Sequence, residues 1–144
     1  MFAMNDNKLR ALSEEQLAFF RTEGYLIVKA LLSQAEVDEL QELFMDLHRK
    51  GPIPGYFHPV SEKEANGDIL KVYPRIMHPH RFNNTAFHYM LHPRVMDVLE
   101  DLLGEEALAA QSMFYFKPPG AKGQALHQDN FYLRIEPGTC IAAW

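Results

Sequence analysis

The sequence predicts one α+β domain in which helices come first and antiparallel strands follow. Residues 1–104 contain helix-capping motifs and apolar residues at helical spacing. After residue 105 the sequence changes to aromatic, strand-like segments separated by tight turns. The 144 residues, 47% of them hydrophobic and 23% charged, allow one globular domain with a real core.

The composition also argues against several classes of protein. A net charge of −5 without a basic stripe makes nucleic acid a poor partner. The single cysteine, Cys140, excludes an intrachain disulfide, and its apolar surroundings predict a small buried core residue. No signal peptide and no apolar run of about 20 residues is present. We therefore expect a cytoplasmic protein with no membrane span.

The first predicted element is a short helix. Ser13 with Gln16 three residues later forms a capping-box motif, which predicts a helix over about residues 13–23. Gly24 suits the left-handed backbone that ends many helices. The β-rich run at residues 25–28 then predicts a strand.

A longer helix follows. Ser33 and Glu36 repeat the capping-box motif, and apolar residues recur at helical spacing as far as Lys50. Residues 51–70 are rich in proline, glycine and polar residues, which predicts a long loop. Because long loops inside compact domains are often functional, this loop is a candidate for substrate contacts.

The remaining elements alternate in type. Residues 69–73 predict a short strand, and residues 85–91 and 93–103 predict two short helices. Strands are then predicted in the last third of the chain, over residues 111–117, 125–135 and 139–144, with proline- and glycine-containing turns between them. Three strands joined by tight turns favour an antiparallel sheet or barrel.

His127 and Asp129 carry the most informative chemistry. In a strand, residues two apart point to the same face, so the imidazole and the carboxylate would project side by side. With a second histidine, such a pair makes the two-His, one-carboxylate site of non-haem iron(II) oxygenases. The bare pattern is weak, because chance predicts about one third of a match in a chain of this composition. A surface or capping pair is the alternative.

A longer pattern surrounds this pair. Residues 114–120 (FYFKPPG) are followed by residues 126–133 (LHQDNFYL) and residues 138–144 (GTCIAAW). This order of strand, turn, His-x-Asp strand, turn and apolar strand ending in tryptophan resembles the phytanoyl-CoA dioxygenase family. The N-terminal helices and residues 24–28 are also similar. The resemblance covers essentially the whole chain, but only the first half or so of a usual family member.

The resemblance implies a fold and an activity. The fold is a double-stranded β-helix, the antiparallel barrel of jelly-roll and cupin-like proteins, with helices packed outside. Residues 1–144 would form a single, truncated domain of this kind: mainly helical with short strands to residue 104, and the start of an incomplete barrel over residues 105–144. The activity is that of an Fe(II)/2-oxoglutarate-dependent dioxygenase that hydroxylates a small organic substrate.

The resemblance also assigns roles to four residues. His127 and Asp129 match the first two iron ligands at the catalytic centre. Lys71 matches the position whose ammonium helps to bind 2-oxoglutarate, and Trp144 matches a tryptophan that lines the cosubstrate pocket. A solvated lysine and a core aromatic residue are equally good readings of these last two. Gln128 or Asn130 would brace the ligands.

Two parts of the family pattern have no counterpart in the sequence. One is a histidine on a later strand, the third ligand, and the other is an arginine that pairs with the far carboxylate of 2-oxoglutarate. His78 and His80 are the best internal substitutes, although an exposed loop or capping pair is the better reading. His88 and His92 are read as helix-end residues, and His48 as a positive partner of a helix C-terminus.

Two other classes of protein stay open. A non-catalytic binding or structural module would dimerise by pairing the unpaired strand edge at residues 139–144. A cupin-like isomerase or sugar-binding protein is less well supported, because such sites bring more histidines near the first pair of strands. Production of succinate would separate the oxygenase from both.

Overall fold

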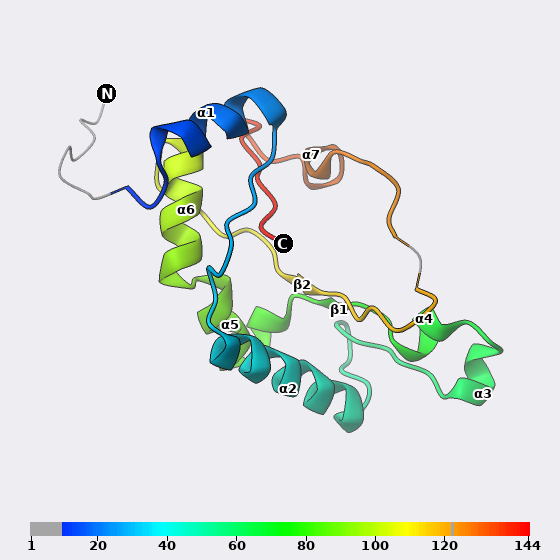
Figure 1. The fold of residues 1–144 in the computed structure, drawn as a ribbon. Coiled ribbons are helices and arrows are strands. Elements are labelled where there is room, and N and C mark those ends of the chain that lie inside the picture. The colour runs from blue at the N-terminus through cyan, green and yellow to red at the C-terminus, as the bar shows by residue number, and fades with distance from the viewer. Residues whose placement is uncertain (1–9, 122) are drawn as a thin grey trace. The chain divides into compact units, whose positions relative to one another are not determined.

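The computed structural model describes residues 10–121 and 123–144 (Figure 1). They divide into two compact units. The first unit comprises the described residues up to Leu31, Leu91–Leu108 and Gln128–Trp144, and the second comprises Leu32–Met90 and the described part of Ala109–His127.

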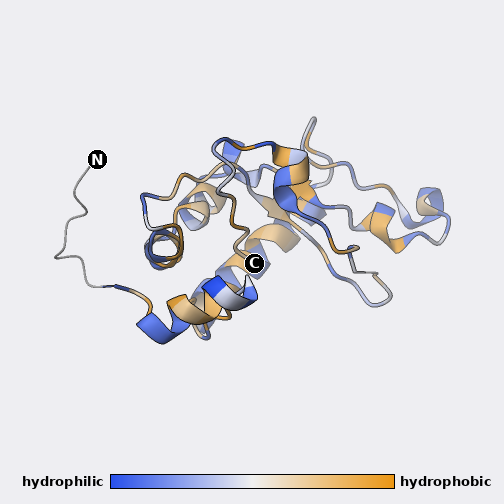
Figure 2. Cartoon of the chain, turned by 90° about the horizontal axis from the view of Figure 1, so that it is seen from above, coloured by the Kyte–Doolittle hydropathy of each residue, from blue (hydrophilic) through white to orange (hydrophobic). Residues whose placement is uncertain are grey.

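Helices dominate both units. The first unit contains α1 (Glu14–Glu23), α6 (Pro93–Leu103) and α7 (Asp129–Leu133). The second contains α2 (Gln34–Lys50), α3 (Glu62–Ala65), α4 (Ile69–Val72), β1 (Ile76–Met77), the 3-10 helix η1 (Pro79–Arg81), α5 (Asn84–Met90) and β2 (Met113–Phe114). The helices carry both hydrophilic and hydrophobic residues, as expected of helices that bury one side (Figure 2).

The predicted caps of the first two long helices are confirmed. Ser13 and Gln16 form a capping box at the start of α1, and Gly24 ends this helix with a left-handed backbone at φ 77°. Ser33 and Glu36 form the same motif at the start of α2. The two predicted helices between residues 85 and 103 are also present, as α5 and α6.

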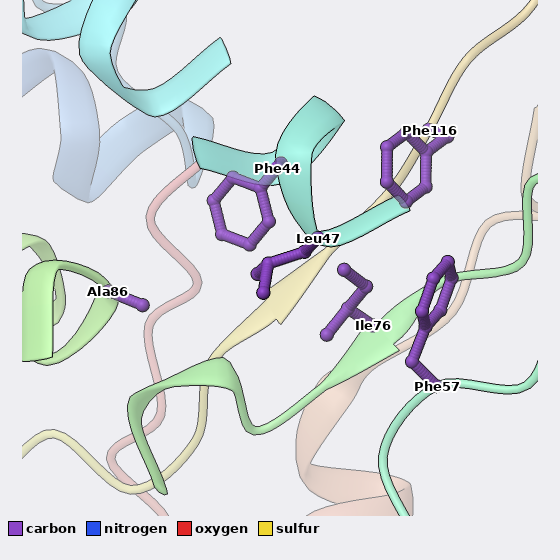
Figure 3. Packing of buried hydrophobic residues seen from close by; sticks show 6 residues of the cluster. All are labelled: Phe44, Leu47, Phe57, Ile76, Ala86 and Phe116. Carbon is purple, nitrogen blue, oxygen red and sulfur yellow. The ribbon is translucent and has the colours of Figure 1, made fainter. Parts of the chain in front are cut away.

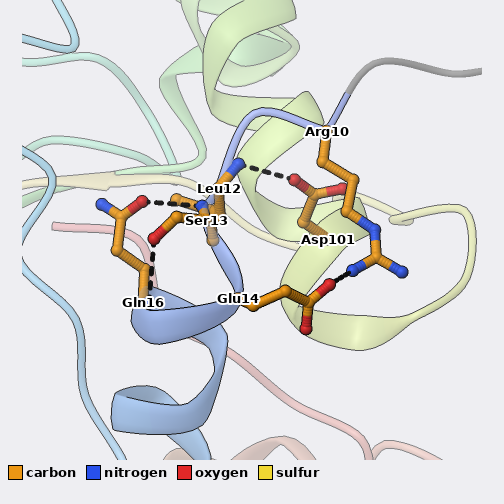
Figure 4. Close-up of polar contacts among 6 residues, drawn as sticks. All are labelled: Arg10, Leu12, Ser13, Glu14, Gln16 and Asp101. Carbon is orange, nitrogen blue, oxygen red and sulfur yellow. Dashed lines mark hydrogen bonds and ion pairs between the residues drawn. The ribbon is translucent and has the colours of Figure 1, made fainter.

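The first unit has a small core in which α1 packs against α6. Its buried residues are Leu12, Leu17 and Val98. Just before α1, the backbone N–H of Leu12 donates to Oδ2 of Asp101 in α6 at 2.9 Å (Figure 4). This bond pairs the amide of a buried residue with a charged acceptor from the neighbouring helix.

The strand predicted at residues 25–28 is wrong, although its alternation is real. Leu26 and Val28 pack against the core of the first unit, whereas Tyr25 and Ile27 are exposed. The side chains thus alternate between core and solvent as they would in a strand, but the segment forms no strand. A strand needs a neighbour to accept its backbone hydrogen bonds, and the pattern of side chains does not supply one.

The second unit has the larger core (Figure 3). Its buried residues come from α2, β1, α5 and the segments beside them, and they are Phe44, Leu47, Phe57, Ile76, Ala86 and Phe116. Phe57 is 1% exposed and Ile76 is fully buried. Phe44 stacks on Phe114 with 3.7 Å between ring centroids, so β2 is joined to α2 by aromatic packing.

A two-stranded antiparallel sheet runs through this core. Ile76 pairs with Phe114 and Met77 with Met113. The strand predicted over residues 111–117 is thus present over only its middle, and β1 was not predicted. The chain is α+β, but within the described residues the barrel predicted for residues 105–144 is not confirmed.

Two further strand predictions are wrong. Residues 125–135 contain the short helix α7, and residues 139–144 have no regular structure. Asn130 accounts for part of the difference, because its Oδ1 accepts the backbone N–H of Ile135 at 2.7 Å and closes the chain just after the helix. An extended strand could not make this local bond.

The polar segment before β1 also differs from its prediction. Part of the expected loop is α3, which starts at a third capping box formed by Ser61 and Glu64. The strand predicted over residues 69–73 is the one-turn helix α4, capped by the side chain of Asp68. Both caps are visible in the sequence, one as a serine before an acidic run and the other as an aspartate before an apolar run. No helix in the described residues is long and apolar enough to cross a membrane.

Candidate metal centre

His127 is exposed and lies in a segment of the second unit without regular secondary structure. Its Nδ1 is 2.8 Å from the carbonyl oxygen of Ala125. A carbonyl oxygen only accepts, so Nδ1 carries the proton in this contact and Nε2 keeps its lone pair. A backbone carbonyl that fixes the tautomer in this way is typical of histidines that bind metals.

Asp129 is the first residue of α7, in the first unit. Burial raises the pKa of the Cys140 thiol, and the negative charge of Asp129 raises it further. The carboxylate and the thiol are therefore near each other within this unit. Cys140 is half-buried, and not fully buried as predicted.

The strand argument for the pair does not hold in this structure. His127 and Asp129 flank Gln128, the residue that precedes α7, and they belong to different units. The predicted geometry placed the two side chains on one face of a strand. In the structure, a loop followed by the start of a helix takes the place of that strand. The assignment of both residues as ligands remains a prediction that rests on the sequence pattern.

Lys71 is exposed on α4 of the second unit, not on a strand. Its backbone is well fixed. The N–H of Lys71 donates to the carbonyl of Asp68 at 3.0 Å, and its own carbonyl accepts the N–H of Val60 at 3.1 Å. An ammonium on a fixed backbone at the surface is able to attract a carboxylate.

Trp144 lies in the first unit and is 87% exposed. It is therefore not a core residue, and its role beside the cosubstrate stays a prediction. Asn130, one of the two residues expected to brace the ligands, bonds through its side-chain amide to the backbone of Ile135. The described residues contain no group of three or more His, Cys, Asp or Glu side chains that could hold a metal ion.

The internal histidines form one notable cluster, at the start of η1. Nδ1 of His80 is 2.6 Å from Oγ of Ser112, and the His78 and His80 rings lie edge to face with 5.7 Å between centroids. Burial is the main cause that lowers the pKa of both imidazoles, and Arg81 lowers both further. These two histidines are more enclosed than an exposed loop pair. His88 and His92 lie at helix ends, as predicted.

His48 is a residue whose surroundings the sequence did not reveal. It lies in the last turn of α2, as predicted, but its Nε2 is 2.9 Å from the carbonyl oxygen of Val72. Its ring stacks on Tyr73 with 4.3 Å between centroids. The partners lie 24 and 25 positions away along the chain, beyond the reach of local patterns.

The chemistry of the predicted donors fits iron(II). One imidazole and one carboxylate are two of the three protein ligands of a facial non-haem iron site. The tautomer at His127 presents a lone pair on Nε2, which is the form that a metal requires.

Comparison with known proteins gives consistent matches. The family model described as phytanoyl-CoA dioxygenase (PhyH) matches residues 20–144. A phytanoyl-CoA dioxygenase of Arabidopsis thaliana is 27% identical over 169 aligned residues, which cover 93% of this chain and 58% of the relative. Phytanoyl-CoA dioxygenase 1 of Oryza sativa subsp. japonica is 26% identical over 167 residues, with 93% and 58% covered.

An animal relative is matched over a smaller share of its length. The peroxisomal phytanoyl-CoA dioxygenase of Bos taurus is 26% identical over 142 residues, which cover 92% of this chain and 42% of the relative. The chain thus spans about half the length of the curated relatives that it matches. No solved structure matches the chain.

Proposed function

The chain belongs to the phytanoyl-CoA dioxygenase family, and from this membership we propose that it supplies part of an iron(II)- and 2-oxoglutarate-dependent oxygenase for a small organic substrate. The observation that carries the proposal is the family match over residues 20–144, which includes the His127-Gln128-Asp129 motif. The proposed fold of the whole domain is the double-stranded β-helix, with residues 105–144 at its beginning.

We assign His127 and Asp129 as two iron ligands. The Nδ1–H of His127 is held by the Ala125 carbonyl, so Nε2 would face the metal. Asp129 would add a carboxylate oxygen, a donor that iron(II) accepts alongside imidazole. Iron, 2-oxoglutarate and dioxygen together supply the oxidising power that amino-acid side chains lack.

Lys71 and Trp144 are proposed to contact 2-oxoglutarate. The ammonium of Lys71 would pair with a carboxylate of the cosubstrate, and the backbone hydrogen bonds on both sides of Lys71 would limit its movement. The exposed indole of Trp144 would cover the cosubstrate and exclude water. The substrate itself would be selected by loops such as residues 51–61.

Anaerobic binding of Fe(II) tests the ligand assignment. The affinity of the wild-type chain is compared by calorimetry with those of His127→Ala and Asp129→Ala, and His58→Ala serves as a control at another exposed histidine. We expect each ligand variant to lose more than about tenfold in affinity, because even residues outside the ligand set contribute about ten- to 100-fold. Equal affinity in His127→Ala and His58→Ala would reject the assignment.

A second candidate function is a dimerising or binding module. The observation that favours it is the exposure of large apolar side chains near the C-terminal end, namely Leu126, Phe131, Tyr132 and Trp144. Sedimentation across a range of protein concentrations tests it. Concentration-dependent dimers that form equally well in His127→Ala, together with no iron binding, would favour this function over the oxygenase.

A further inference from the structure

His48 is half-buried at the end of α2, where its ring contacts an aromatic cluster of the second unit. Its ring stacks almost parallel on Tyr73, with an interplanar angle of 10°. The ring of Phe116 meets it edge-on at 5.4 Å, and that of Phe57 lies 6.0 Å away. Since Phe57 and Phe116 are buried, these contacts fix the plane of the imidazole.

The polar edge of this imidazole has a definite partner. Nε2 of His48 is 2.9 Å from the carbonyl oxygen of Val72, the last residue of α4. Because a carbonyl oxygen has no proton to give, the bond requires the tautomer protonated at Nε2. A histidine that served only the dipole of its own helix would face the last carbonyls of α2, and this ring reaches a different helix.

The helix that His48 contacts is unable to hold its own position. α4 has only four residues, and a single turn of helix is far below the length that is stable in isolation. Two successive carbonyls fix it from outside: that of Lys71 accepts from Val60, and that of Val72 accepts from His48. Of these two donors, only His48 belongs to a long helix anchored in the core through Phe44 and Leu47.

We propose that His48 is a positioning residue for the cosubstrate site: it ties α4 to α2 and thereby places the ammonium of Lys71 where 2-oxoglutarate binds. The inference rests on the proposed function in one respect, the role of Lys71. The rest of it depends on contacts among residues of a single unit. His48 touches neither metal nor cosubstrate in this account and acts through the backbone of α4.

The test compares two substitutions that differ in one chemical group. His48→Gln keeps an N–H donor at a similar reach, whereas His48→Leu fills the space without a donor. Hydrogen exchange is measured first on the amides of Lys71 and Tyr73, which bond within or beside α4. We expect faster exchange in His48→Leu and nearly wild-type exchange in His48→Gln. Unchanged exchange in His48→Leu would overturn the anchoring of α4.

The second measurement is the affinity of the iron-loaded protein for 2-oxoglutarate. His48→Leu should weaken it about three- to tenfold, the equivalent of one hydrogen bond, with iron affinity unchanged and with recovery in His48→Gln. Lys71→Met is measured in parallel and should weaken 2-oxoglutarate binding at least as much. If His48→Leu and His48→Gln weakened 2-oxoglutarate binding equally, the hydrogen bond from His48 would not position α4, and the proposal would be overturned.

Failure of the inference and failure of the proposed function give different results. If Lys71→Met weakens 2-oxoglutarate binding and His48→Leu does not, the positioning role is wrong and the function stands. If exchange at α4 rises in His48→Leu but Lys71→Met binds 2-oxoglutarate normally, the role of Lys71 is wrong. The positioning of the cosubstrate by His48 is overturned with it.

Discussion

The core of the second unit and the segment over residues 123–144 both contain aromatic residues, but only those of the core are buried. In the second unit, Phe57 and Ile76 are buried among residues from α2, β1 and β2. In residues 123–144 no side chain is buried, and Phe131 is 75% exposed. The difference is whether partner elements are present to cover an apolar face.

This comparison explains why the segment does not form the predicted strands. An amphipathic strand is stabilised by cross-strand neighbours and by burial of one face, and alternation alone supplies neither. Local hydrogen bonds then decide the conformation, such as the one from the Ile135 N–H to Asn130. In the second unit β2 has both an antiparallel neighbour and the stacked ring of Phe44.

The most direct test of this difference removes a phenylalanine ring from each region. Phe57→Ala should lower the free energy of unfolding by about 3–5 kcal/mol, because it opens a cavity in a packed core. Phe131→Ala should change it by less than about 0.5 kcal/mol, because the ring is mostly in water. Urea unfolding measures both. Similar losses at the two positions would show that Phe131 is buried in the native protein.

A second test removes the polar link of the first unit. Asp101→Ala leaves the amide of buried Leu12 without its acceptor, and should lower the free energy of unfolding by about 1–3 kcal/mol. Asp101→Asn is the matched control, since it keeps an oxygen acceptor of the same reach. If thermal or urea unfolding gave equal losses for Asn and Ala, a role of the aspartate charge would replace this bond as the explanation.

Removing a helix cap should lower the free energy of unfolding by less. The loss should be larger for a helix that packs on a core. Ser33→Ala at the start of α2 should lower the free energy of unfolding by about 1 kcal/mol. Ser61→Ala, before the four-residue helix α3, should melt that turn and affect global unfolding less. Denaturation together with hydrogen exchange at α3 separates the two effects. A larger global loss from Ser61→Ala would contradict this ranking.

The smallest expected effect is a dependence on pH from His78 and His80. Burial, with the Arg81 charge and, for His80, the neighbouring His78, holds the pKa of each imidazole below the ordinary 6.5. The unfolded chain therefore binds protons first as the pH falls. Stability is full above pH 6.5 and declines as the pH drops through the folded pKa values.

The measurement is the urea midpoint at about pH 7.5 and about pH 5.5. The wild-type protein is compared with the double variant His78→Gln/His80→Gln, and His58→Gln serves as the control. The double variant should lose less stability on acidification than the other two proteins. A loss as large as that of the wild type would assign the acid sensitivity to other groups.

The sequence allowed prediction where structure is determined locally. The capping boxes at Ser13 and Ser33 and the terminating Gly24 are local signals, and α1 and α2 were predicted from them. The strands failed because pairing depends on distant segments: Ile76 finds Phe114 38 positions away. The third cap at Ser61 was a local signal that the composition of the loop concealed.

The candidate site likewise has one part that the sequence predicted and another that required the fold. His127, Asp129, Lys71 and Trp144 were chosen from a sequence pattern, and the family match over residues 20–144 is consistent with that pattern. The structure changes the local setting of Lys71 and Asp129 from strand to helix. The contact of His48 with Val72 required the fold, because no local spacing relates these two residues.

The most direct test of the proposed oxygenase site is an anaerobic titration of the iron-loaded protein with 2-oxoglutarate, followed by visible absorption. Chelation of the cosubstrate to iron(II) produces a charge-transfer band, so no prime substrate is needed. We predict a saturable band in the wild-type protein and in His58→Ala, and its loss in His127→Ala. A band of equal strength in His127→Ala would contradict the assignment of His127 as a metal ligand of this chain.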